Sequence, residues 1–271
     1  MANSQKAIIT FFVFFFATIF FMTNEEKAPK KEFVPITLPN EEKEEKIKPE
    51  PLKIEEPKWL NYPAIRNVSN LGKILSDIES HMPSGHQYQS NDKITWAHET
   101  SHGLASLIRR NKYGYNGFYV LENRAILIKE PNITISDAAK LVPSSLRGMA
   151  YDLYMVRQKQ WNGQPLYIFD EWVAYTNGST TRADLKITSR TESVQQMLEF
   201  SVYSISVAMA SRTEDPQLKI FLKWNLARTM EVYKLNKNLG DLSRCEQYLI
   251  KMKPFVGNYL GEDFVKEIFN F

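Results

Sequence analysis

Apolar residues recur at the spacing of an α-helix along most of the chain after residue 59. Together with capping residues, this pattern predicts that helices form most of the domain. The expected helices cover residues 71–80, 94–110, 144–160, 166–175, 191–212, 216–239, 242–253 and 262–271, and a further short helix is expected at Asp137. The pair Asn177-Gly178 is expected to end the helix 166–175, because glycine favours helix C-termini.

Two short apolar runs interrupt the helical pattern. Phe118–Leu121 and Ala125–Ile128 are separated by Glu122–Arg124, which predicts a β-hairpin. The expected fold class is therefore α+β, mostly helical, with a small β-sheet or hairpin. The free edge of this hairpin could pair with an extended peptide, or the hairpin could be purely structural.

The first 58 residues differ in composition from the rest. Residues 7–22 carry no charge, and as a helix they would span about 24 Å, slightly less than a bilayer core. Residues 1–23 are therefore expected to form a signal anchor or a signal peptide, and the lack of a small-residue cleavage site favours the anchor. Residues 24–58, rich in Glu, Lys and Pro, are expected to be a disordered linker. The expected location is membrane-anchored and extracytoplasmic, or secreted if residues 1–23 are removed.

The overall charge is nearly balanced, with 34 basic and 31 acidic residues. No group of Lys and Arg residues alternates with aromatic residues, so nucleic acid is not an expected partner. Cys245 is the single cysteine of the sequence, which excludes an intrachain disulfide and a zinc site built on several cysteines.

The segment 94–110 contains the pattern H-E-x-x-H at His98, Glu99 and His102. Residues four positions apart lie on the same face of a helix, so both imidazoles can reach one Zn²⁺. Glu99 then points toward a water on the metal rather than toward the metal itself. The chain has four histidines in 271 residues, so chance formation of this pattern is improbable.

A third ligand must come from later in the chain. No histidine follows His102, so this ligand is expected to be a carboxylate. Glu171 is preferred because its apolar and aromatic surroundings, IFDEWVAY, would make a buried carboxylate costly without a cation. Asp170 would then cap its helix or hydrogen-bond a ligating imidazole. Alternatively, both acids could be exposed in the first turn of the helix. The carboxylates that were compared are Asp152, Asp170, Glu171, Glu192 and Glu199.

With HETSH followed by DEWVAY, the chain resembles the gluzincin type of zinc metallopeptidase, over roughly residues 90–178. The resemblance implies a zincin-like α+β domain over residues 59–271, with Zn²⁺ held by His98, His102 and Glu171. It also implies that Glu99 is the catalytic base. The chain departs from zincins in one respect: their sheet usually precedes the motif helix, whereas the clearest strands here follow it.

The function expected from these residues is hydrolysis of peptide bonds in a peptide or protein substrate, by a domain that residues 7–22 attach to a membrane. The oxyanion formed in this reaction needs a donor besides the metal. The candidates are Tyr151, Tyr154, Tyr167, Tyr175 and Arg147, with Asp170, Tyr154 and Tyr175 as the main supporting residues of the site. Two alternatives stay open: a non-catalytic surface protein whose structural zinc also uses His81 or His86, and a zinc amidase acting on non-protein amides.

Overall fold

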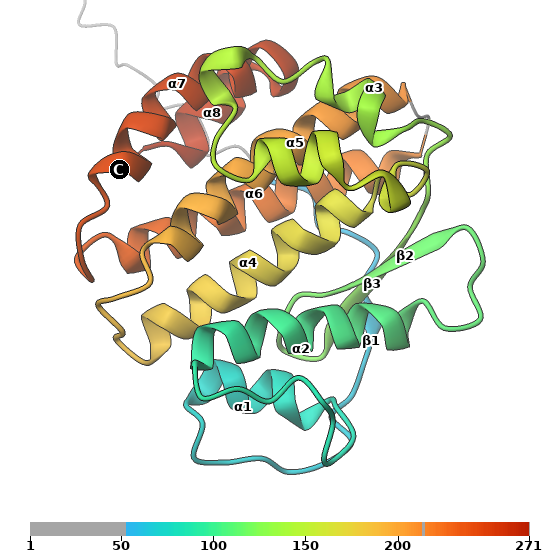
Figure 1. The fold of residues 1–271 in the computed structure, drawn as a ribbon, viewed down its shortest axis with the longest axis vertical. Helices are drawn as coiled ribbons and strands as arrows, with labels where there is room; N and C mark the ends of the chain where they lie inside the picture. The colour runs from blue at the N-terminus through green and yellow to red at the C-terminus, as the bar shows by residue number, and fades with distance from the viewer. Residues whose placement is uncertain (1–52, 213–214, 271) are drawn as a thin grey trace, which may run out of the picture. The chain divides into compact units, whose positions relative to one another are not determined.

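Helices make up most of the structure, a computed structural model that describes residues 53–212 and 215–270 (Figure 1). The helices are α1 (Lys73–Ser80), α2 (Lys93–Ile108), α3 (Ile135–Ala139), α4 (Tyr167–Asp184), α5 (Glu192–Ser211), α6 (Pro216–Asn236), α7 (Ser243–Leu260) and α8 (Glu262–Ile268). The expected anchor at residues 1–23 and most of the expected linker lie outside the described residues. Within the described part, no helix has both the length and the apolar content of a membrane span.

The strands form one antiparallel sheet, so the expected fold class, α+β and mostly helical with a small sheet, is confirmed. Strands β2 (Tyr115–Tyr119) and β3 (Arg124–Lys129) form the expected hairpin, and β1 (Leu60–Asn61) pairs with the other edge of β3. The expected strand bounds were partly wrong. The first strand begins at Tyr115, and the turn contains Leu121, Glu122 and Asn123, all with positive φ. Asn123 is a residue type that favours this conformation, whereas Leu121 and Glu122 gave no signal for it.

The sheet is buried on both faces. On β2, Phe118 packs in a large core shared with α4, α5, α6 and α7, whereas the adjacent Tyr119 packs in a smaller core with α1 and α2. Successive residues of a strand point to opposite faces, which explains this division. Consequently the sheet and α1 fix the position of α2 relative to the rest of the domain.

Helix α4 runs between α2 on one side and α5 and α6 on the other (Figure 1). The expected end of this helix at Asn177-Gly178 was wrong, because α4 continues to Asp184. A Cβ atom on Gly178 would lie 3.2 Å from the backbone oxygen of Ile94, so glycine permits a close crossing with α2. Asn177 is buried and its amide donates to Ser101 Oγ (2.9 Å) and to the carbonyl of Tyr119 (3.1 Å). Both residues thus join helices instead of ending one.

The single helix expected over residues 144–160 was also wrong. This segment forms a 3₁₀ turn at Ser144–Leu146, a π-helix at Asp152–Arg157 and another 3₁₀ turn at Lys159–Trp161. Part of the reason is Glu199 of α5, which accepts a hydrogen bond from the backbone N–H of Ala150 (3.0 Å). This tertiary contact holds the backbone near residue 150 and competes with a continuous helix.

The close crossing of α2 and α4 can be tested with a larger side chain at Gly178. Gly178→Val is expected to lower the free energy of unfolding by about 1–3 kcal/mol, because its methyl groups must displace the backbone of Ile94. Gly163→Val is the matched control, because no atom lies within 4 Å of a Cβ built there. Chemical denaturation of both variants checks this, and an equal loss of stability in the two would contradict the proposed crossing.

Candidate metal centre

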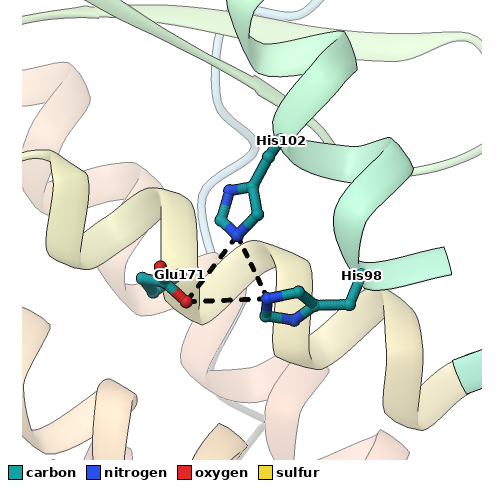
Figure 2. Close-up of side chains that lie close together, drawn as sticks. All are labelled: His98, His102 and Glu171. Atoms are coloured by element: carbon teal, nitrogen blue, oxygen red, sulfur yellow. Dashed lines mark hydrogen bonds and ion pairs between the residues drawn. The ribbon is translucent and has the colours of Figure 1, made fainter. Parts of the chain in front are cut away.

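The two histidines of the motif lie on α2, at the spacing that brings them onto one face. Asp92 caps the helix by accepting a hydrogen bond from the backbone N–H of Ile94 (3.0 Å), and its carboxylate also accepts from Thr95 (2.9 Å). One and two turns later, the Nε2 atoms of His98 and His102 face each other at 3.1 Å (Figure 2). This is the arrangement expected from the sequence.

Glu171 reaches the same point from α4. Its Oε2 atom lies 3.7 Å from Nε2 of His98 and 3.7 Å from Nε2 of His102 (Figure 2). Ligand atoms bound tetrahedrally to zinc at about 2.0–2.1 Å are separated by roughly 3.3 Å. The three measured distances lie on either side of this value, so the three side chains could together bind one metal ion.

The Glu171 carboxylate fits a cation for a second reason. Its Oε2 atom is buried and has no hydrogen-bond partner in the described part of the chain. A buried carboxylate oxygen without a partner costs free energy, which a metal ion at this point would offset. Burial acts to raise the pKa of Glu171, but the neighbouring His102, His98 and Tyr167 outweigh it and lower that pKa.

Asp170 is placed behind His102. Its Oδ2 atom lies 3.2 Å from Nδ1 of His102. Two roles were expected for Asp170, capping its helix or contacting a ligating imidazole. No side chain caps the start of α4, so the structure shows the second role. A carboxylate at this position fixes the ring so that Nε2 points to the metal side. The alternative of two exposed acids is excluded, since Asp170 and Glu171 are both buried.

The charges of the site differ between the two imidazoles. Burial and the charge of His102 lower the pKa of His98 to about 3, so this ring is neutral and keeps a free lone pair. Burial also acts to lower the pKa of His102, but Asp170 and Glu171 outweigh it and hold the pKa above the usual 6.5. The positive charge of His102 therefore faces two buried carboxyl groups, and burial raises the pKa of Asp170. A divalent cation would reduce the cost of burying these two acidic side chains together.

A small cavity of about 170 Å³ opens beside His98. Glu99, Tyr154 and Tyr175 line it, and the Tyr175 ring lies 4.3 Å from the His98 ring, measured between centroids. The His98 and His102 side chains are 13% and 20% exposed, compared with 4% for Glu171. Both imidazoles are thus partly accessible, while the carboxylate is shielded.

The other residues considered as oxyanion donors or metal ligands lie away from this centre. Tyr151 donates its hydroxyl to the carbonyl of Ala139, and Arg147 donates to the carbonyl of Val142, so neither is directed at the site. His81 is bonded to Asn123 Oδ1 (2.9 Å).

The remaining candidates are already paired: His86 with Glu79, Asp152 with Arg157, Glu192 with Arg190, and Glu199 with the backbone of Ala150.

Sequence reasoning did not single out three residues that line the cavity beside His98. Arg190, Ser193 and Gln196 come from the segment that leads into α5 and from α5 itself. Arg190 has positive φ, and it contacts Asp92 (2.9 Å) and Glu192 (3.0 Å). Their positions depend on how α5 packs against α4, for which the sequence carries no local signal.

Comparisons of the chain with protein-family models, with curated proteins and with solved structures gave no match. A function for this chain is therefore inferred from the geometry of its own site.

Zinc affinity tests the ligand set and its support. Glu171→Ala is expected to abolish tight binding, and Asp170→Asn to weaken it about 10- to 100-fold, because a neutral amide replaces the charged acceptor of the His102 imidazole. Asp152→Asn, which removes an exposed carboxylate paired with Arg157, is expected to change nothing. Competition with a chromophoric chelator measures all three, and equal affinities for Asp170→Asn and Asp152→Asn would show that Asp170 does not support a metal ligand.

Proposed function

We propose that this chain is a zinc-dependent peptidase in which His98, His102 and Glu171 bind the metal. The observation that carries the proposal is the convergence of two Nε2 atoms and one unpartnered carboxylate oxygen, 3.1–3.7 Å apart, beside an accessible cavity. Two imidazoles and one carboxylate, with one position left open, form the ligand set of several catalytic zinc sites. In this proposal residues 7–22 attach the enzyme to a membrane and its domain lies outside the cytoplasm.

When bound, zinc would supply a Lewis acid that makes water nucleophilic near neutral pH and polarises a carbonyl group. The side chain of Glu99 follows His98 on α2 and lines the cavity where a substrate carbonyl would enter. Glu99 can accept the proton of the attacking water and return it to the leaving amine. His98, His102 and Glu171 are then occupied as ligands, which leaves Glu99 as the base.

Tyr154, which lines the cavity beside His98, is the donor that we assign to the oxyanion of this reaction. Burial raises the pKa of Tyr154 to about 12, so its hydroxyl keeps its proton and can donate it to a group bound in the cavity. The π-helix at Asp152–Arg157 carries this side chain, and such helices are frequent at functional sites.

Of the two alternatives, only a structural zinc predicts a different set of metal ligands. A structural zinc needs a fourth protein ligand, but neither His81 nor His86 belongs to the group formed by His98, His102 and Glu171. An amidase acting on non-protein amides would use the same metal and the same base. A panel of peptides and small amides separates the two hydrolases.

The role of Glu99 can be tested with an isosteric change. Glu99→Gln is expected to keep its zinc and to lose hydrolysis by at least about 10²-fold, because the amide cannot accept the water proton. Zinc content by elemental analysis and cleavage of a quenched fluorescent peptide give the two readouts. An unchanged rate would remove this mechanism, and lost zinc would show that Glu99 has a structural role.

The role of Tyr154 can be tested by removing one oxygen atom. Tyr154→Phe is expected to lower kcat about 10²-fold with little change in KM, because the lost bond forms mainly in the transition state. Tyr175→Phe should have a smaller effect, since this change keeps the ring that packs against His98. Tyr151→Phe is the control, because that hydroxyl is bonded to the carbonyl of Ala139. Equal rates for the Tyr154 and Tyr151 variants would contradict the assignment.

A further inference from the structure

A second, larger hollow lies at the C-terminal end of α2, with a volume of about 590 Å³. Its lining is rich in cationic and aromatic side chains: Arg109, Arg110, Lys112, Tyr113 and Tyr115, with Glu130 as the one carboxylate among its lining residues. Tyr113 is 96% exposed, so its ring is held out in solvent at the rim of the hollow. The mechanism proposed above uses none of these residues.

Three cations lie close together in this hollow. Arg110 and Lys112 are exposed and form no ion pair in the described part of the chain, and Arg109 donates to Asn116 Oδ1 (3.4 Å). Burial raises the pKa of Glu130 to about 7, so it cancels only part of the positive charge at neutral pH.

The hollow lies on the same helix as the candidate metal centre. Ser106 and Arg109 follow His102 by four and seven residues and thus share its face of α2. Seven residues of helix rise about 10 Å, which an extended peptide covers in roughly three residues. At the other end of α2, the cavity beside His98 contains Glu99, together with Glu192 paired to Arg190. The basic side chains on this side of the domain are therefore concentrated in the hollow beyond His102.

We propose that the hollow binds acidic side chains of the substrate and places an Asp or Glu about three residues from the bond that is cleaved. The proposal rests on the peptidase function proposed above and adds a substrate preference to it. Arg110 and Lys112 would pair with the carboxylate, and Arg109, fixed by Asn116, would form the floor. An acidic peptide is favoured over a nucleic acid because the cations are confined to residues 109–112, whereas a phosphate backbone needs a longer basic track.

Binding to the full-length, zinc-loaded Glu99→Gln protein tests this preference without turnover. The probes are two fluorescein-labelled decapeptides, one neutral and one with two Asp residues, and a single-stranded DNA of ten nucleotides. The acidic peptide is expected to bind about tenfold more tightly than the neutral one at low salt, with the difference shrinking as salt is added. Adding Arg110→Glu and Lys112→Glu to the Glu99→Gln protein should abolish the difference in affinity between the two peptides. Lys237→Glu with Lys251→Glu changes the net charge equally and should keep the difference; both positions are exposed, Lys237 directly after α6 and Lys251 on α7.

Three outcomes would overturn the proposal: equal affinity for the two peptides, equal loss in both double variants, or tighter binding of the DNA than of the acidic peptide. Cleavage of the neutral peptide by the wild-type protein is measured separately. No cleavage together with a retained charge preference would refute the peptidase function and leave an acid-binding surface. Cleavage without a charge preference would refute only the proposed preference for acidic substrates. An Asp scanned along a cleaved peptide should raise kcat/KM most about three residues from the scissile bond.

Discussion

The close crossing of α2 and α4 is the constraint on which the candidate site depends. Gly178 lets the two helices approach, because any side chain there would press on the backbone of Ile94. The buried amide of Asn177 joins the same helices by bonding to Ser101 and to β2, and its oxygen accepts from Arg228 of α6 (2.6 Å). With the crossing fixed in this way, Glu171 comes to lie opposite two imidazoles that one helix face already presents together.

The crossing also creates an electrostatic problem. It buries Asp170 and Glu171 next to each other, with the proton on His102 as the nearest compensating charge. Such an arrangement is costly for folding alone, since buried charges are normally paired or bound to a metal. We interpret the burial of two adjacent acidic side chains as the property that suits the site to a divalent cation. The accessible imidazoles and the adjoining cavity are the reason for preferring a catalytic role over a structural one.

Much of this site could be predicted from the sequence, because its chemistry is local. The spacing of His98 and His102 places them on one face of a helix, and the acidic residues 170 and 171 stand out in an apolar segment. The same local reasoning was wrong at Asn177-Gly178, where a helix-stop signal is used for a helix crossing. It also missed the π-helix that carries Tyr154. The backbone just before that helix, at Ala150, is held by the carboxylate of Glu199, which lies 49 residues later in the chain. Contacts between distant segments leave no mark on the short patterns from which helices are predicted.

The most direct test of the account is X-ray absorption spectroscopy at the zinc edge on the purified, zinc-loaded chain. The account predicts one zinc per chain with two imidazole nitrogens and one or two further oxygen ligands at about 2.0–2.2 Å, and no sulfur. It also predicts that the imidazole signal falls when His98 is replaced by alanine. Less than stoichiometric zinc, or a spectrum that the His98 change leaves unaltered, would contradict the assignment of this crossing as a metal centre.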